Sequence, residues 1–273
     1  MGLAHRSSAA LLGLLLAPAP APAVDAGLVV RLAAANQRAA EERGTPMAFR
    51  QVEVHTELLG DGRRGPAERF TFLSFSDGRG VTRRQLLEVD GRPPTDREVA
   101  RTQRQDEKRR EKAARNGSED GTDDLLSGRL PLSDLLTRFD FRFVREEPFA
   151  GRPAYLVEFG PKEGLEARTL KDRVLNGFAG RAWIDAAELQ PIRIEGRLTR
   201  PVQVAGGLAL SLRDVRFLYE GHPVLPGVWA PCLEEIRVDA RAAVFLGFSR
   251  EVRYEFSGYR GVSPVAEARP RAR

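Results

Sequence analysis

Residues 180–198, GRAWIDAAELQPIRIEGRL, carry two alternating segments on either side of a short turn. In the second segment, the apolar residues Ile192, Ile194 and Leu198 are separated by arginines and a glutamate. Side chains of a strand point to opposite faces in turn, so this pattern is typical of an antiparallel strand with one buried face. The segment therefore predicts a β-hairpin with one dry face and one solvated face.

The same period of two recurs along most of the chain. Strands are expected at 47–58, 68–76, 80–90, 139–145, 153–159, 178–185, 191–199, 208–219, 227–240, 242–248 and 251–259. No segment between the strands from residue 178 onward is helical and long enough for a parallel crossover. One amphipathic helix is expected at 25–43, with Leu28, Leu32, Ala35 and Ala39 on its apolar stripe. The predicted fold class is α+β, a curved antiparallel sheet forming an open half-barrel with this helix as a cover.

Residues 92–127 interrupt the strand pattern. Thr95 and Glu98 match a helix capping box, and the stretch that follows, up to Arg115, is very polar. This composition predicts a charged helix that is mostly solvated, followed by a flexible loop at 116–124. We therefore expect a single domain at 24–263 with a helical insertion at 92–127, and a disordered tail at 264–273.

The first residues have the pattern of a secretory signal peptide. His5 and Arg6 precede nine apolar residues at 9–17, which is too short for a bilayer span. Ala21 and Ala23 place small residues at the −3 and −1 positions of a cleavage site. A cleavable signal peptide is thus expected at 1–23. The mature chain is expected in the periplasm. It is expected to carry no lipid anchor, because no cysteine directly follows the apolar core.

Composition limits the classes of partner and of chemistry. The net charge is +5, and only four of the 43 basic residues are lysines. This arginine excess, with the many Ala, Gly and Pro residues, indicates a GC-rich genome rather than a nucleic-acid-binding protein. Cys232 is the single cysteine, so an internal disulfide is excluded and a buried thiol is expected. No nucleic-acid partner is expected, and the chain is expected to be a monomer.

The histidines of the mature chain offer little for catalysis. His55 is expected on a strand and His222 in a turn, and a metal site would need them to meet acids such as Glu234 or Glu235. No nucleophile elbow accompanies them. We therefore expect no enzyme activity, cofactor or metal, and a hydrolase built around either histidine stays as a third hypothesis.

Residues 180–196 resemble the central hairpin of the periplasmic lipoprotein-carrier (LolA/LolB/RseB-like) superfamily, of the outer-membrane lipoprotein-sorting type. The shared features are Trp183-x-Asp185, a turn, and then Pro191-x-Arg193-x-Glu195. The helix after the signal peptide and the closing strand around Tyr259 are also similar, so the resemblance spans about 25–260. It implies a half-barrel whose concave apolar face, lidded by helices, holds acyl chains or hydrophobic peptide without catalysis.

The first functional hypothesis is a non-enzymatic periplasmic carrier or chaperone. It would bind a lipid, a lipoprotein acyl chain or another apolar ligand in the concave face, with envelope proteins or an anionic membrane surface as further partners. The alternative is an envelope sensor or interaction domain with a filled core. Trp183 and Trp229 could be core anchors or cavity walls. The candidate lining residues, which depend on strand register, are Phe70, Ile184, Ile192, Ile194, Leu198, Val215, Phe217, Ile236, Val238, Val252, Tyr254 and Phe256.

Overall fold

The computed structural model describes residues 24–59, 63–76, 82–114, 136–204, 210–242 and 246–262. The predicted signal peptide, the loop at 116–124 and the tail at 264–273 lie outside these residues. Within them, the helices are α1 (Ala26–Arg43), α2 (Asp96–Ala114) and α5 (Leu170–Leu175). The strands are β1 (Met47–Leu58), β2 (Arg64–Ser76), β3 (Thr82–Val89), β4 (Phe139–Phe149), β5 (Arg152–Pro161), β6 (Phe178–Asp185), β7 (Pro191–Leu198), β8 (Val202–Val204), β9 (Leu210–Leu225), β10 (Val228–Ala242) and β11 (Leu246–Gly261).

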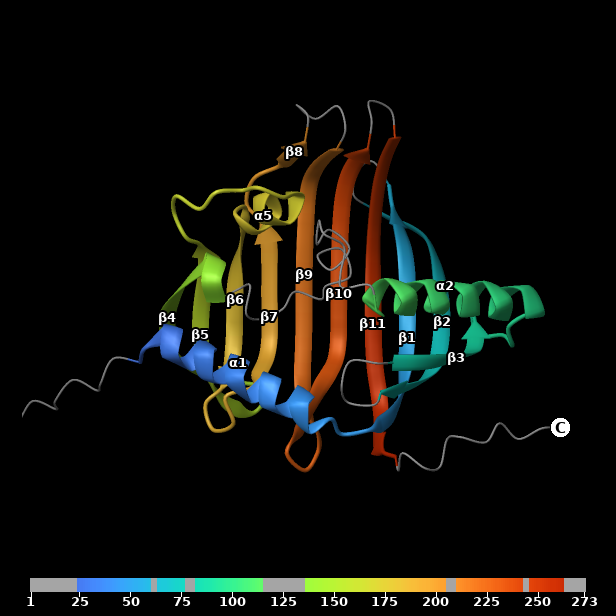
Figure 1. The fold of residues 1–273 in the computed structure, drawn as a ribbon, viewed down its shortest axis with the longest axis horizontal. Helices are drawn as coiled ribbons and strands as arrows, with labels where there is room; N and C mark the ends of the chain where they lie inside the picture. Colours follow the sequence, from blue (N-terminus) through green and yellow to red (C-terminus); the bar gives the residue numbers. More distant parts are fainter. Residues whose placement is uncertain are drawn as a thin grey trace, which may run out of the picture.

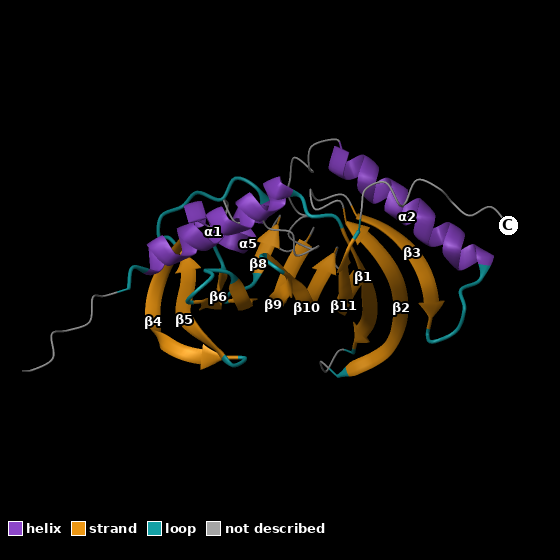
Figure 2. Ribbon diagram, turned by 90° about the horizontal axis from the view of Figure 1, so that it is seen from below, coloured by secondary structure: helices purple, strands orange, loops and turns teal. Residues whose placement is uncertain are grey.

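The strands form one antiparallel sheet. Its order is β3-β2-β1-β11-β10-β9-β7-β6-β5-β4, and β8 pairs with β9 beside this path. Strands β3 and β4 are the two edges, so the sheet is open, and it is strongly curved (Figure 2). The predicted α+β class with a curved, open antiparallel sheet is therefore confirmed.

The chain builds this sheet from two directions. Strands β1 to β3 run from the middle of the sheet to one edge, whereas β4 to β11 begin at the opposite edge and return. The two parts meet where β1 pairs with β11, with Gln51 opposite Phe256. The predicted insertion at 92–127 thus contains α2 and belongs to the connection between the two sheet edges.

Helices α1, α2 and α5 lie on one side of the sheet, which we call the inner face (Figures 1 and 2). The opposite side is called the outer face. Helix α1 packs on β5 and β6 at one end of the sheet, where its small residues meet Val157 and Ile184. The buried stripe of α1 consists of Ala26, Val29, Val30, Ala33 and Ala34.

The predicted apolar stripe of α1 was wrong in register. Leu28 and Leu32 are 47% and 42% exposed, on the side of the helix that faces away from the sheet. Small side chains at the buried positions let the helix backbone approach the sheet closely, which large leucines would prevent. Asp25 accepts a hydrogen bond from the Leu28 amide at 3.0 Å and begins the helix, and Gly44, at φ 58°, ends it.

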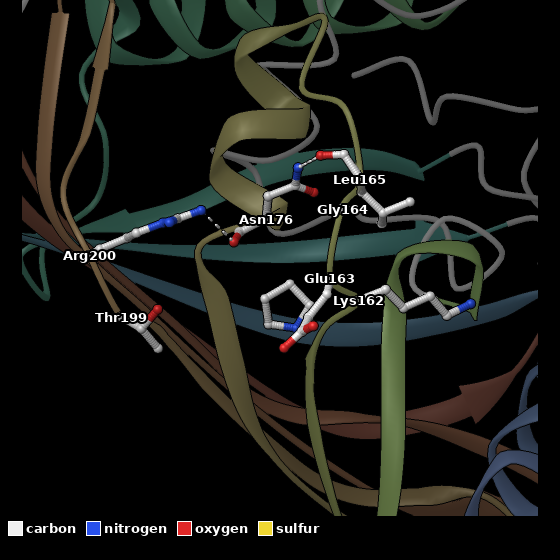
Figure 3. Close-up of a pocket in the computed structure, with 8 residues that line it drawn as sticks. Lys162, Glu163, Gly164, Leu165, Asn176, Thr199 and Arg200 are labelled. Atoms are coloured by element: carbon white, nitrogen blue, oxygen red, sulfur yellow. Dashed lines mark hydrogen bonds between the residues drawn. The ribbon is translucent and has the colours of Figure 1, made fainter.

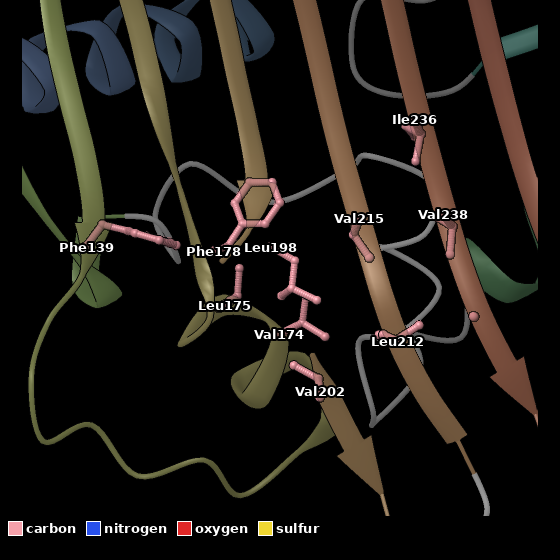
Figure 4. Packing of buried hydrophobic residues seen from close by; sticks show 11 residues of the cluster. Phe139, Val174, Leu175, Phe178, Leu198, Val202, Leu212, Val215, Ile236 and Val238 are labelled. Atoms are coloured by element: carbon pink, nitrogen blue, oxygen red, sulfur yellow. The ribbon is translucent and has the colours of Figure 1, made fainter. Parts of the chain in front are cut away.

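Helix α5 lies in the connection between β5 and β6. Thr169 and Asp172 form a capping box at its N-terminus, which stabilises a helix of this short length. Val174 and Leu175 are buried on the inner face against β-strand residues (Figure 4). This cluster consists of Phe139, Val174, Leu175, Phe178, Leu198, Val202, Leu212, Val215, Ile236, Val238 and Ala240.

The strand predictions need one further correction. The sequence predicted separate strands at 242–248 and 251–259, but β11 runs without a break from Leu246 to Gly261. The two residues between the predicted strands, Ser249 and Arg250, therefore form ladder pairs of their own, with Asp239 and Val238.

The turn of the central hairpin depends on Asp185. Its carboxylate accepts hydrogen bonds from the amides of Ala187 and Glu188, at 3.0 and 2.7 Å, and from Arg152 at 2.5 Å. Burial alone would raise the pKa of Asp185, but Arg152 and the two amides outweigh burial and lower it. The Trp-x-Asp pattern thus has a physical reason, because the aspartate satisfies the amides of the turn.

Candidate ligand-binding face

Two rows of residues cross the middle of the inner face. In the first, Ile194 on β7 lies opposite Tyr219, which lies opposite Glu234. The row continues through Tyr254 on β11 to Glu53 on β1. Directly opposite residues of an antiparallel pair share one face, so these five side chains form a continuous band across the sheet. The band combines apolar, aromatic and acidic groups.

The second row lies beside the first and is more apolar. It joins Phe217 on β9, Ile236 on β10, Val252 on β11 and His55 on β1. At its β7 end, Gly196 lies opposite Phe217.

Gly180 and Gly196 leave room for aromatic rings at that end of the row. A Cβ atom on Gly196 would lie 2.4 Å from the Phe178 ring, and one on Gly180 would lie 2.7 Å from the Phe159 ring. The rings of Phe159 and Phe178 stack at 6.5 Å over this space. Glycine is therefore required for aromatic side chains to lie flat on the sheet here.

Several of the predicted lining residues are already covered by helices. Leu198, Val215, Ile236 and Val238 are buried in the α5 cluster, with Phe217 packed at its border. Ile184 is buried beneath α1. These parts of the inner face are filled, as the sensor or interaction-domain hypothesis predicts.

Phe70 is covered by neighbouring strands rather than by α1 or α5. It is buried in a cluster with Phe72, Leu86 and Val89 on β2 and β3. The remaining predicted lining residues are half-buried, and they lie on β7, β9 and β11 between α5 and α2. We call them the central strip, and they are Ile194, Phe217, Val252, Tyr254 and Phe256.

Ile192 lies on the outer face, and its prediction as a lining residue was wrong. It packs with Trp183 and Leu156, with Trp229 at the border of the cluster. The register of β6 and β7 shifts by one residue at Trp183 and Ile184, and this bulge turns Ile192 away from the face of Ile194. Both tryptophans therefore belong to an outer-face cluster and not to the wall of an inner-face cavity.

A buried polar network joins α2 to the inner face. Ser74 donates to Gln51 and Gln51 donates to Glu53, both at 3.0 Å. Arg84 on β3 forms ion pairs with Glu53 and, at 2.5 Å, with Asp106 on α2. Burial alone would lower the pKa of Arg84, but the two carboxylates raise it. Arg84 therefore stays charged and holds α2 on the sheet.

Two half-buried tyrosines, Tyr219 and Tyr259, extend the polar part of the face. The hydroxyl of Tyr259 donates to the carbonyl of Pro231 at 2.6 Å. Burial, more than the neighbouring Glu234 carboxylate, raises the pKa of Tyr219, and burial followed by Tyr219 raises that of Tyr259. Both hydroxyls thus remain protonated donors at neutral pH.

The sequence pattern did not predict this polar network, because alternation alone indicates a uniformly dry inner face. A signal was present: Gln51, Glu53 and His55 alternate with apolar residues in 47–58, in phase with the inward-facing Phe49. Polar residues at inward positions of a strand require partners, since a buried charge is costly alone. Nothing in the sequence indicated that Arg84 and Asp106 would supply them.

The histidines of the hydrolase hypothesis occupy separate places. His55 lies on the inner face, 3.3 Å from a Glu53 oxygen, whereas His222 is exposed on β9 opposite Ala230. Among the residues that the structure describes, no group of three or more His, Cys, Asp or Glu side chains could hold a metal ion. In the same part of the chain, no helix has the length and apolar character needed to cross a membrane.

One pocket lies away from the central strip. It has a volume of about 400 Å³ and opens beside α5, between the chain after β5 and the chain after β7 (Figure 3). Its lining mixes polar and apolar groups and contains none of the predicted lining residues. It consists of Pro161, Lys162, Glu163, Gly164, Leu165, Asn176, Thr199 and Arg200.

The sequence has no match among protein-family models. It has no match among curated proteins either. Three solved structures resemble the fold. A putative outer membrane lipoprotein-sorting protein domain from Vibrio parahaemolyticus is 13% identical, with a TM-score of 0.30 over 87% of this chain and 95% of its own. A DUF1329 family protein from Desulfovibrio piger is 12% identical, with a TM-score of 0.35 over 90% of this chain and 97% of its own.

The third structure is the MucA/MucB complex of Pseudomonas aeruginosa, 12% identical, with a TM-score of 0.24 over 88% of this chain and 100% of its own. At these identities and TM-scores the likeness carries no argument about function, which has to be drawn from the inner face.

Proposed function

We propose that this chain is a non-enzymatic carrier or chaperone of the periplasm that holds an acyl chain, or another apolar ligand, against the central strip. The observation that carries the proposal is the strip itself. Its side chains stay half-buried between α5 and α2, whereas the apolar residues on either side are fully buried. A chain of methylenes lying along it would gain about 0.8 kcal/mol for each buried CH₂.

The chemistry beside the strip favours a particular end group. Glu53 and Glu234 share the row of Tyr254, and Tyr219 keeps its hydroxyl proton. Glu234 disfavours a free carboxylate at this position, because like charges repel in a site of low polarity. An acyl chain in ester or amide linkage, as in a lipoprotein, therefore fits better than a free fatty acid.

The test compares two neighbouring residues that point to opposite faces. Phe217 belongs to the central strip, whereas Leu218 lies opposite Glu195 on the outer face. Both are half-buried, so Phe217→Glu and Leu218→Glu are matched changes. We expect a fluorescent acylated peptide to bind the wild-type chain and Leu218→Glu, and to bind Phe217→Glu at least tenfold more weakly. Equal binding by both variants, or none by the wild type, would refute the proposal.

A second function is favoured by a specific observation. Leu198, Val215 and Val238 are buried in the cluster that also contains Val174 and Leu175 of α5, so a large part of the inner face is a filled core. A filled core suits a sensor or interaction domain that binds an envelope protein. Native mass spectrometry of chain purified from its own periplasm separates the two: a retained lipid supports the carrier, whereas a lipid-free chain that captures a defined protein supports the sensor.

A further inference from the structure

The outer face is a lattice of ion pairs. Arg181 pairs with Glu158 at 3.1 Å, and Arg253 pairs with Glu255 at 2.9 Å. Glu158 also pairs with Arg142 from the edge strand. Cross-strand neighbours of opposite charge stabilise a solvated sheet face and leave it close to neutral. Against this background, a row of three adjacent arginines stands out, because two of them have no acidic partner among the described residues.

Three arginines break the pattern. Arg197 on β7 lies directly opposite Arg216 on β9, which lies directly opposite Arg237 on β10. Arg216 bonds Asp214 at 2.9 Å. Within the described residues, Arg197 and Arg237 form no hydrogen bond or ion pair, and the Nε of Arg237 is buried without a partner. We call Arg197, Arg216 and Arg237 the arginine row.

The acid nearest in register to the row is engaged elsewhere. Glu251 on β11 lies opposite Arg237. Its Oε1 accepts from Nε of Arg64 at 2.9 Å and lies 2.7 Å from another guanidinium nitrogen of the same residue. Glu251 is buried, so its charge is committed to Arg64. The arginine row therefore keeps an excess of positive charge at the centre of the outer face.

Without a bound ligand, the arginine row destabilises the folded state. Like charges directly opposite one another destabilise a sheet, and a buried donor without an acceptor loses its hydration without compensation. Adjacent strands lie about 4.8 Å apart, so the three residues span about 10 Å. An anion with several acceptor oxygens would satisfy both deficits at once. Guanidinium groups match the oxygens of phosphate in pairs.

We propose that the arginine row is a binding site for phosphate groups, as carried by anionic phospholipid headgroups or by free phosphate. The site is on the face opposite the central strip. It does not depend on the proposed acyl-chain binding, because ligand on the inner face and phosphate on the outer face would not compete. A carrier with this arrangement could rest its outer face on an anionic surface while its inner face stays accessible.

The experiment measures binding of the mature chain to vesicles of phosphatidylcholine with and without phosphatidylglycerol. Arg197→Gln/Arg237→Gln removes two charges from the row. The control Arg142→Gln/Arg213→Gln removes two charges from arginines that have acidic partners on the same face. We expect the row variant to bind phosphatidylglycerol vesicles about 30-fold more weakly than the wild type. The control should lose no more than about threefold, since distant charges act through a screened field.

Two further measurements complete the test. Arg237→Lys keeps the charge but not the paired donors, so it should also weaken binding severalfold, and its unchanged fold can be checked by its melting temperature. Titration with inorganic phosphate distinguishes the sources: phosphate binding without vesicle binding assigns the site to free phosphate, and vesicle binding assigns it to headgroups. An equal loss in the row and control variants, or no binding of either probe, would overturn the proposal.

Discussion

Arg84→Met removes the cation that joins α2 to the inner face. The Arg84 side chain is 9% exposed, and those of its partners Glu53 and Asp106 are 4% and 15% exposed. Without Arg84, the Glu53 carboxylate stays buried with its strongest compensating charge removed. Breaking a buried pair from one side costs about 3 to 5 kcal/mol. With a urea slope of about 3 kcal/mol/M, the unfolding midpoint should fall by about 1 M or more.

Two variants make this prediction specific. Arg83→Met changes the adjacent, exposed residue of the same strand and should shift the unfolding free energy by less than about 0.5 kcal/mol. Arg84→Met/Glu53→Met removes both charges and should recover at least half of the loss, because apolar side chains can replace a buried pair at little cost. A loss below about 1 kcal/mol for Arg84→Met, or no recovery in the double variant, would refute the reasoning.

The remaining predictions concern the hairpin, the glycines and the start of α2. Asp185→Ala should lower the free energy of unfolding in urea by about 3 kcal/mol, since it leaves two turn amides and Arg152 without their acceptor. A loss below about 1 kcal/mol would contradict the role of Asp185 in the turn. Gly196→Ala should lower stability by about 1 to 3 kcal/mol through its clash with the Phe178 ring, and an unchanged melting temperature would count against it. The bond from Arg92, followed by those from the Thr95 amide and hydroxyl, lowers the pKa of Glu98 to about 2. A carboxylate whose pKa is lowered by folding stabilises the folded state at any pH above its unfolded pKa, and this stabilisation is lost as the pH falls towards the folded pKa. The first turn of α2 should therefore loosen between about pH 4.5 and 2. Amide exchange at that turn measures it, and exchange independent of pH there, after correction for intrinsic rates, would disprove the link.

The sequence was most informative about features that depend only on residues close together in the chain. The capping box at Thr95 and Glu98 is present as predicted, with the Thr95 amide 2.7 Å from the Glu98 carboxylate. Alternation in 191–198 predicted a half-buried strand, and β7 is that strand. These features depend on neighbours within a few residues, which a single sequence displays directly.

Features that depend on distant contacts could not be predicted in the same way. The bulge that turns Ile192 outward depends on how β6 and β7 align, and alternation alone cannot locate an extra residue. The buried stripe of α1 depends on how closely the helix approaches the sheet, so small residues rather than Leu28 and Leu32 face inward. The pairing of Arg84 with Glu53 joins residues 31 apart in sequence, and no local pattern specifies it.

The central claim is that an apolar chain lies on the central strip of the inner face. The most direct measurement is photo-crosslinking of an acylated peptide that carries a photoreactive group on its acyl chain, with mapping by mass spectrometry. We expect crosslinks to the central-strip residues Ile194, Phe217 and Tyr254, and none to Leu218, which lies next to Phe217 but points to the outer face. Crosslinks confined to the outer face or to the pocket beside α5, or an absence of crosslinks at saturating peptide, would contradict it.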